Sequence, residues 1–158
     1  MTQRVFPAST VLERHYPHAI GRVFRAWSEP SAFAAWHAPG GDWVNGDCAL
    51  DFRVGGRVMV FFGPKGSPRY RSEGRFEDIA KPVLGRGRLV ISDTMTDEQE
   101  KARFTSTLLT VEFVEEQGGT LLTLTDQSVF YGFETADDRK GGWAEILEKL
   151  DIHLKGNP

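Results

Sequence analysis

The spacing of apolar residues changes along the chain, and this change is the strongest constraint on its fold. Between residues 18 and 36 apolar side chains recur every three or four positions, and from residue 42 to about 131 they recur mostly every second position. From about residue 135 the longer spacing returns. A period near 3.6 is typical of helices and a period of two is typical of strands. The sequence therefore predicts an α+β class, with short helices near the front, strands in the middle and one closing helix.

The front of the chain is predicted to hold one strand and two short helices. The strand covers residues 9–16, ends at Pro17 and has an ambiguous inward face, because its apolar residues alternate imperfectly. The first helix covers residues 18–27 and presents one apolar stripe. Ser28 can cap a second helix that has Pro30 near its first turn and stops at residues 39–41.

The middle of the chain is predicted to form consecutive antiparallel strands with short turns. The clearest strand is 69–77, where arginine and glutamate occupy one face and Tyr70, Ser72, Gly74 and Phe76 occupy the other. Such a strand belongs to a sheet with one solvated face, so Tyr70 and Ser72 are expected to point inward. One further predicted strand runs from residue 50 to Val54, and the others cover residues 57–62, 88–95, 104–115 and 120–131. The polar segment 96–102 is predicted to be a loop.

The closing helix is predicted to start with a capping box formed by Thr135 and Asp138. Its apolar stripe consists of Trp143, Ile146, Leu147, Leu150 and Leu154. It is the only predicted element long and apolar enough to cover the apolar face of the sheet. A strongly twisted sheet curled around one helix leaves space between them, so we expect an apolar cavity. Periodicity alone leaves a fully packed core open as the alternative.

Composition and charge narrow the function classes. The 158 residues suit a single domain, 1–158, and the net charge of −3 argues against a nucleic-acid partner. Cys48 is the one cysteine and has no partner for an internal disulfide, so a cytoplasmic location is expected. No apolar run has the length of a membrane span, and the first ten residues lack the apolar core of a signal peptide. No metal site and no cofactor are expected, because the four histidines show no metal-binding spacing.

Five segments, in order, resemble the activator-of-Hsp90-ATPase-like (AHSA1) family of the START/polyketide cyclase/Bet v 1-like (SRPBCC) superfamily. Residues 23–40, VFRAWSEPSAFAAWHAPG, resemble its signature VFxAWTxPxxxxxWWxP. The other four resemble its DLRVGGR, EGxF, TVEF-GGTxLTLT and GWxxxLxxL motifs, and they are residues 51–57, 73–76, 109–124 and 142–150. The resemblance covers residues 9–155. It implies the helix-grip fold, a curved antiparallel sheet wrapped around a long C-terminal helix, with two short helices after the first strand.

The family resemblance also implies a range of functions. Members of the superfamily mostly bind hydrophobic or amphipathic small molecules between sheet and helix, so the expected partner is a small lipophilic molecule. The alternatives are a cyclase or hydrolase that uses the same cavity and a co-chaperone-like module that binds a protein partner. A homodimer through an edge strand is also possible.

The candidate site residues follow from the predicted inward faces of the strands and helices. Asp126 and Ser128 fall in register with inward Leu124 if their strand is regular, whereas a bulge would turn them outward. His37 stands where the family often has a second aromatic residue and could donate to a ligand or act as a base, although a surface histidine at a helix end is the favoured interpretation. No catalytic residue is assigned, and the candidates for catalysis are His37, Tyr70 and Asp126. The predicted ligand-binding residues are Phe33, Trp36, His37, Phe52, Tyr70, Phe76, Phe113, Phe130, Trp143 and Leu147.

Overall fold

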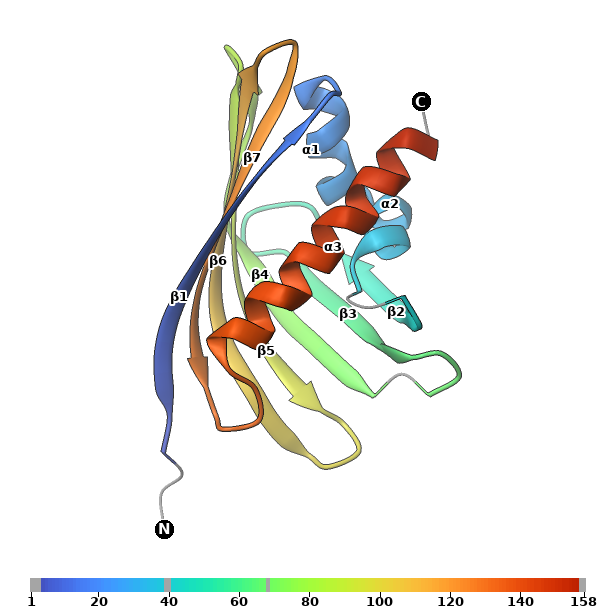
Figure 1. The fold of residues 1–158 in the computed structure, drawn as a ribbon, viewed down its shortest axis with the longest axis vertical. Coiled ribbons are helices and arrows are strands. Elements are labelled where there is room, and N and C mark those ends of the chain that lie inside the picture. Colours follow the sequence, from blue (N-terminus) through green and yellow to red (C-terminus); the bar gives the residue numbers. More distant parts are fainter. Residues whose placement is uncertain (1–3, 39–40, 68, 157–158) are drawn as a thin grey trace.

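The computed structural model describes residues 4–38, 41–67 and 69–156, and in these the chain forms one curved antiparallel sheet and three helices (Figure 1). The elements in chain order are β1 (Phe6–Tyr16), α1 (Ile20–Ser28), α2 (Pro30–Trp36), β2 (Trp43–Leu50), β3 (Arg57–Pro64), β4 (Tyr70–Val83), β5 (Arg86–Asp97), β6 (Ala102–Glu116), β7 (Gly119–Phe130) and α3 (Ala136–Gly156).

Strands β2 to β7 form a meander, and β1 is added to the sheet beside β7. Its order is β1-β7-β6-β5-β4-β3-β2, and each neighbouring pair is antiparallel. Strands β1 and β2 are therefore its two edges. The helix α3 crosses one face of this sheet, while α1 and α2 lie beside the C-terminal half of α3 (Figure 1). The predicted α+β class and helix-grip architecture are confirmed.

The start of α3 is set by its own sequence. The backbone N–H of Asp138 donates to Thr135 Oγ1 at 3.1 Å, and the backbone N–H of Thr135 donates to Asp138 Oδ2 at 2.9 Å. This reciprocal pair is the predicted capping box, and it satisfies N–H groups that the first helical turn leaves without partners. The predicted apolar stripe is also confirmed, because the buried residues of α3 are Trp143, Ile146, Leu147, Leu150 and Leu154.

The two short helices fill one end of the core with rings. Trp27 is fully buried, and its ring centroid lies 4.8 Å from that of Trp36 and 6.2 Å from that of Phe33. Trp36 donates its indole N–H to the carbonyl of Ala26 at 3.0 Å, so its one polar atom is satisfied. These rings pack this end of the molecule solidly.

The strand predicted to reach Val54 is shorter than expected. Strand β2 ends at Leu50, and the chain then turns through backbone hydrogen bonds from Arg53 to Asp51 at 2.9 Å and from Gly56 to Arg53 at 2.8 Å. Phe52 therefore packs from a turn, edge to face against Phe24 and Phe76. The predicted strand end at Val54 is wrong because a turn residue such as Phe52 can face the core and continue the alternation beyond the paired strand.

The loop predicted at residues 96–102 is also shorter in the structure. Strand β5 continues to Asp97 and β6 begins at Ala102. Asp97 is buried and accepts hydrogen bonds from the Arg69 guanidinium and from the backbone N–H groups of Gln99 and Glu100 at 3.0 and 3.2 Å. Its charge is thus paired inside the sheet, so the polar composition of the segment does not end the strand at residue 96.

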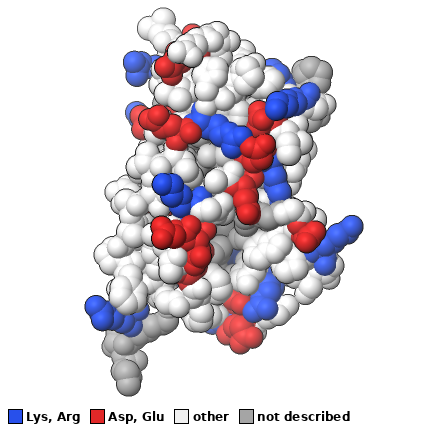
Figure 2. Space-filling view, in the orientation of Figure 1, with Lys and Arg blue, Asp and Glu red and all other residues white. Residues whose placement is uncertain are grey.

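The solvated face of the sheet carries the predicted row of alternating charges. Arg57 donates to Glu73 at 2.6 Å across β3 and β4, and Arg75 donates to Glu77 at 2.8 Å along β4. On the face that carries α3, Figure 2 likewise shows acidic and basic side chains interspersed. Within the part of the chain that the structure describes, no helix is long and apolar enough to cross a membrane.

Candidate functional site

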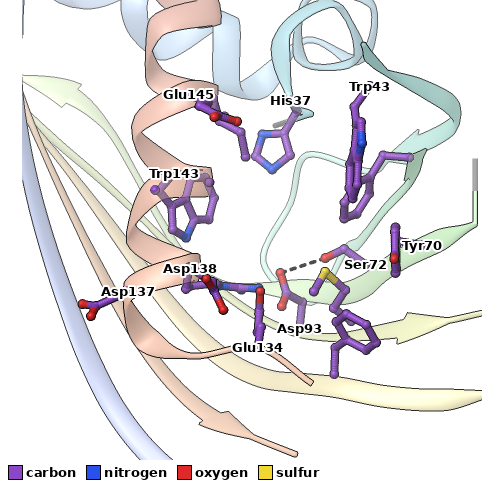
Figure 3. A pocket seen from close by; sticks show the side chains of 17 residues that line it. His37, Trp43, Tyr70, Ser72, Asp93, Glu134, Asp137, Asp138, Trp143 and Glu145 are labelled. Carbon is purple, nitrogen blue, oxygen red and sulfur yellow. Dashed lines mark hydrogen bonds and ion pairs between the residues drawn. The ribbon is translucent and has the colours of Figure 1, made fainter. Parts of the chain in front are cut away.

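A cavity of about 560 Å³ lies between the sheet and the N-terminal half of α3 (Figure 3). Strands β2 to β6 supply one wall, α3 supplies the opposite wall, and His37 enters from the end of α2. The predicted space between sheet and helix is therefore present. Its lining residues are His37, Trp43, Phe62, Tyr70, Ser72, Asp93, Met95, Phe104, Glu134, Asp137, Asp138, Arg139, Gly141, Gly142, Trp143, Glu145 and Ile146.

One part of the cavity wall is aromatic. The rings of Trp43 and Tyr70 stack with their centroids 5.2 Å apart, and the ring centroid of Phe104 lies 5.3 Å from that of Tyr70. The ring centroid of Phe62 lies 6.0 Å from that of Trp43 and 6.0 Å from that of Tyr70. These rings come from four strands and form a continuous surface suited to the apolar part of a ligand.

A buried ion pair joins the sheet to α3 beside the cavity. Arg139 donates from Nε to Asp126 Oδ2 at 2.9 Å, and Trp143 donates its indole N–H to the same oxygen at 2.7 Å. Ser128 donates to the other oxygen, Oδ1. Asp126 is 1% exposed and β7 pairs with both neighbours without a register shift, so the regular-strand alternative predicted for this residue holds.

The guanidinium of Arg139 is almost saturated. Its Nη1 donates to Thr105 and Glu134, each at 3.3 Å, and its Nη2 donates to Thr107 at 3.0 Å. Burial lowers the pKa of Arg139, but the carboxylates of Asp126, Asp93 and Glu134 outweigh this effect and raise it. Arg139 is therefore a permanent cation that holds the start of α3 against β6 and β7.

Asp93 points into the cavity from β5 with one oxygen free. Its Oδ2 accepts a hydrogen bond from Ser72 at 3.1 Å, whereas its Oδ1 is buried and has no hydrogen-bond partner among the residues described. Burial raises the pKa of Asp93 to about 6, and the charge of Asp126 adds to this rise, while Arg139 and Ser72 oppose it. The carboxyl group thus sits near the midpoint of its titration at slightly acidic pH.

Gly74 allows the backbone of β4 to approach β5 at Asp93. A Cβ at position 74 would lie 1.7 Å from the carbonyl oxygen of Ser92 and 2.6 Å from the Cα of Asp93. Only glycine fits such a contact, because these neighbours are backbone atoms that cannot rotate away. Gly74 therefore helps to set where the Asp93 side chain enters the cavity.

His37 follows the last turn of α2, and its ring lies among aromatic neighbours. It stacks on Phe33 with centroids 4.0 Å apart and meets Trp143 edge-on at 5.6 Å. Its Nδ1 is buried without a partner in the described part of the chain. Burial, with a smaller effect from Arg139, lowers its pKa to about 3, so the imidazole is neutral at physiological pH. The favoured interpretation as a surface histidine is wrong for the ring, because the turn after α2 directs it inward.

The structure brings only part of the predicted ligand-binding set to this cavity. His37, Tyr70 and Trp143 line it. Phe52 is half-buried in the turn after β2. The remaining six are buried core residues away from the lining, and they are Phe33, Trp36, Phe76, Phe113, Phe130 and Leu147. Periodicity identified their inward face correctly, but it carries no information on which end of the sheet stays open.

Sequence reasoning missed the charged residues of the cavity, although two of them left a signal. Asp93 alternates in register with Leu89, Ile91 and Met95, so its strand placed it on the inward face. Arg139 lies one helical turn before Trp143 and continues the buried stripe of α3 towards its start. Glu134 sits in the loop before α3, where no periodic pattern exists. Among the described residues, no group of three or more histidine, cysteine, aspartate or glutamate side chains is arranged to hold a metal ion.

A curved antiparallel sheet that grips a C-terminal helix around an internal cavity defines the helix-grip class of proteins. Within that class, residues 17–155 match the family described as "Activator of Hsp90 ATPase homolog 1-like protein". The match spans most of the chain, and this protein therefore belongs to the AHSA1-like family of the SRPBCC superfamily.

Solved structures agree with this assignment. A protein of Rhizobium leguminosarum is 31% identical with a TM-score of 0.86, and the alignment covers 99% of this chain and 100% of that one. The Mll3558 protein of Rhizobium loti is 30% identical with a TM-score of 0.80, covering 95% and 99% of the two chains. An AHSA1-like protein of Aeromonas hydrophila shares the fold at 24% identity and a TM-score of 0.72, covering 94% and 93%. A comparison with curated proteins found no match.

Proposed function

We propose that this protein binds a small amphipathic molecule in the cavity between its sheet and α3. The observation that carries the proposal is the pairing of two unlike surfaces in one space. The rings of Trp43, Tyr70 and Phe104 offer apolar contact, while Asp93 Oδ1 and His37 Nδ1 are buried polar atoms without partners among the residues described. Buried polar groups are normally hydrogen-bonded, so these two atoms are suited to a ligand's own polar groups. The volume of 560 Å³ is within the range of about 300 to 1,000 Å³ that is usual for ligand pockets.

The family supports the same proposal. Helix-grip proteins of the AHSA1-like type typically bind small molecules between sheet and helix, and this chain has its cavity at that place. The mixed lining favours an amphipathic ligand over a purely apolar one, because a hydrocarbon would leave Asp93 and His37 without partners.

The proposal is tested by calorimetric titration with N-phenyl-1-naphthylamine, a neutral lipophilic probe. Saturable binding with one site per chain is expected. The variant Met95→Trp, which adds a large ring to the cavity wall, is expected to abolish binding. The matched control Leu108→Trp adds the same ring on an exposed position of β6, and it should bind as the parent does. Absence of saturable binding to the parent, or equal binding by both variants, would contradict the proposal.

Acid–base catalysis in the same cavity is the second candidate function. Asp93, with its pKa raised by burial to about 6, is suited to proton transfer near neutral pH. The catalytic candidates from the sequence fare differently: His37 and Tyr70 line the cavity, whereas both oxygens of Asp126 are engaged by Arg139, Trp143 and Ser128. Turnover of an ester or polyketide-like substrate that Asp93→Asn abolishes would support catalysis, and turnover that Asp93→Asn leaves unchanged would contradict this assignment.

Two partner predictions from the sequence stand as further alternatives. A co-chaperone role would require association with an Hsp90-type ATPase and a change in its rate of ATP hydrolysis. A homodimer would use an edge of the sheet, where Val11 of β1 is 55% exposed. Light scattering at several protein concentrations measures whether a homodimer forms. Co-purification with the ATPase measures the association that a co-chaperone role requires.

A further inference from the structure

The charges that line the cavity are unbalanced. Among the described lining residues Arg139 is the single arginine or lysine, and the acidic ones are Asp93, Glu134, Asp137, Asp138 and Glu145. The charge of Arg139 is already engaged by Asp126, which lies behind the cavity wall, and by Glu134. His37 adds no positive charge at neutral pH, because burial keeps its imidazole neutral. The lining therefore holds more acidic than basic groups, although Asp137, Asp138 and Glu145 are exposed and their charges are screened by solvent.

The excess is concentrated on Asp93 inside the cavity. Glu134 has its ion pair with Arg139, and Asp138 has its hydrogen bond from the backbone N–H of Thr135. Asp93 has one hydrogen-bond donor, the hydroxyl of Ser72, and its Oδ1 is buried without a partner among the described residues, while the charge of Arg139 acts on it without a hydrogen bond. In Figure 3 this carboxyl group points from β5 towards the side of the cavity on which His37 and Trp143 lie. A buried carboxylate of this kind is stabilised strongly by a cationic hydrogen-bond donor.

The aromatic wall next to Asp93 suits the apolar part of a ligand that carries such a donor. The rings of Trp43 and Tyr70 line the same cavity as Asp93 and stack on each other with their centroids 5.2 Å apart. We propose that the ligand is a lipophilic amine, with its protonated nitrogen against Asp93 Oδ1 and its apolar body against the rings of Trp43, Tyr70 and Phe104. This inference rests on the proposed function and names the chemical class of its ligand.

A lipophilic anion fits the site less well. Arg139 has five N–H donors, and four of them are directed to Asp126, Glu134, Thr105 and Thr107. One donor remains for an incoming carboxylate, which would also meet the repulsion of the acidic lining. The observations therefore favour the amine over the acid of the same shape.

The test is calorimetric titration at pH 7.5 with two sets of matched probes. One set is 1-naphthylmethylamine, 1-naphthylmethanol and 1-naphthylacetate, and the other is decylamine, decanol and undecanoate. Within each set the apolar body is constant and only the polar group changes. We expect the amine to bind at least roughly tenfold more tightly than the alcohol in the set whose body fits, and the carboxylate to bind most weakly, because a charge-assisted hydrogen bond replaces a neutral one.

The variant Asp93→Asn separates the role of the charge from that of the cavity. It keeps the shape of the side chain and removes its charge, so the amine should bind to this variant no more tightly than the alcohol does. Asp47→Asn, on an exposed position of β2, is the matched control and should keep the full preference.

The outcomes are distinct. Alcohol binding equal to or tighter than amine binding, carboxylate binding that is tightest, or an amine preference that survives in Asp93→Asn would each overturn the amine inference and leave the proposed function standing. If none of the six probes binds saturably while N-phenyl-1-naphthylamine does, the amine inference alone is overturned, and if that probe also fails to bind, the proposed function is overturned as well.

Discussion

Asp93 combines a buried carboxyl oxygen that has no partner among the described residues with a pKa that burial raises. Among the described lining residues it is the acidic side chain that a strand carries, and it accepts a hydrogen bond from Ser72. The groups around it come from several elements: Ser72 from β4, Asp126 from β7, Arg139 from α3, Glu134 from the loop before α3 and His37 from the end of α2. Its state of charge is therefore a property of the assembled fold.

Replacing Asp93 by asparagine should stabilise the protein at neutral pH. Burial raises the pKa of Asp93 from 3.8 to about 6, so the folded state binds a proton more readily than the unfolded state between these two values. The ionised carboxylate therefore costs stability above about pH 6, and the cost vanishes below about pH 4. We expect Asp93→Asn to raise the free energy of unfolding by roughly 1 to 3 kcal/mol at pH 7.5 and by little at pH 4.

Urea denaturation of parent and variant across this pH range measures the effect, with Asp47→Asn as the exposed control. A gain that is the same at pH 4 and pH 7.5 would show that the stabilisation does not come from the titration of Asp93.

Removing one partner of the ion pair between Asp126 and Arg139 should destabilise the protein, in contrast to Asp93→Asn. Asp126→Ala leaves a buried guanidinium and the indole N–H of Trp143 without their acceptor, and we expect a loss of about 3 to 5 kcal/mol. The double variant Asp126→Leu with Arg139→Met removes both charges and should recover a substantial part of this loss. Thermal and urea denaturation give both values, and a double variant less stable than Asp126→Ala would contradict the account.

Among the elements, α3 combines two tasks that make different demands on its sequence. Its C-terminal half buries Leu147, Leu150 and Leu154 in the solid end of the core, while its N-terminal half lines the cavity and includes Gly141 and Gly142. Two adjacent glycines weaken a helix interior. The capping box at Thr135 and the bonds of Arg139 compensate at the same end.

Replacing Gly141 by alanine should stabilise α3. A Cβ built at this position meets no other atom within 4 Å, so the methyl group adds helix propensity without a clash. The expected gain is about 0.5 to 1 kcal/mol. Gly74→Ala in β4 is the contrasting variant, because its Cβ would overlap the backbone of Ser92, and it should lose about 1 to 3 kcal/mol or more. Denaturation curves that place the two variants in the reverse order would contradict the geometry described for both elements.

The whole molecule has one continuous core that runs from the rings under α1 and α2 to the stripe of α3. Tyr16 at the end of β1 donates its hydroxyl hydrogen to the carbonyl of Leu147 at 2.9 Å, so residues far apart in the chain are joined at its centre. The cavity occupies the end of the sheet that this core does not fill.

The chain is therefore expected to unfold as one cooperative unit, which agrees with the single domain, 1–158, that the sequence predicts. Near-ultraviolet circular dichroism reports on the packed rings of Trp27 and Trp36, and far-ultraviolet circular dichroism reports on sheet and helix. The two thermal transitions should coincide with the calorimetric one. Separate midpoints would indicate two independently folding parts.

The local pattern of the chain was sufficient to predict the order of elements, the antiparallel meander, the capping box of α3 and the inward faces of most strands. Each of these depends on the spacing of residues within one segment, such as the alternation around Tyr70 or the helical stripe from Trp143 to Leu154. Patterns of this kind fail at the ends of elements, as at Phe52 and Asp97, because a turn residue can face the core and a polar residue can be paired inside a sheet.

The position of the cavity depends on tertiary contacts between segments that are far apart in the chain. Phe33, Trp36 and Phe113 have the same inward faces as Tyr70 and Trp143, yet the former fill the core and the latter line the cavity, because the curvature of the sheet closes one end around α1 and α2 and leaves the other end open. The shifted pKa values of Asp93 and His37 have the same origin. Burial and the charge of Arg139 set them, and these depend on distances between strands and helices that no single segment of the sequence contains.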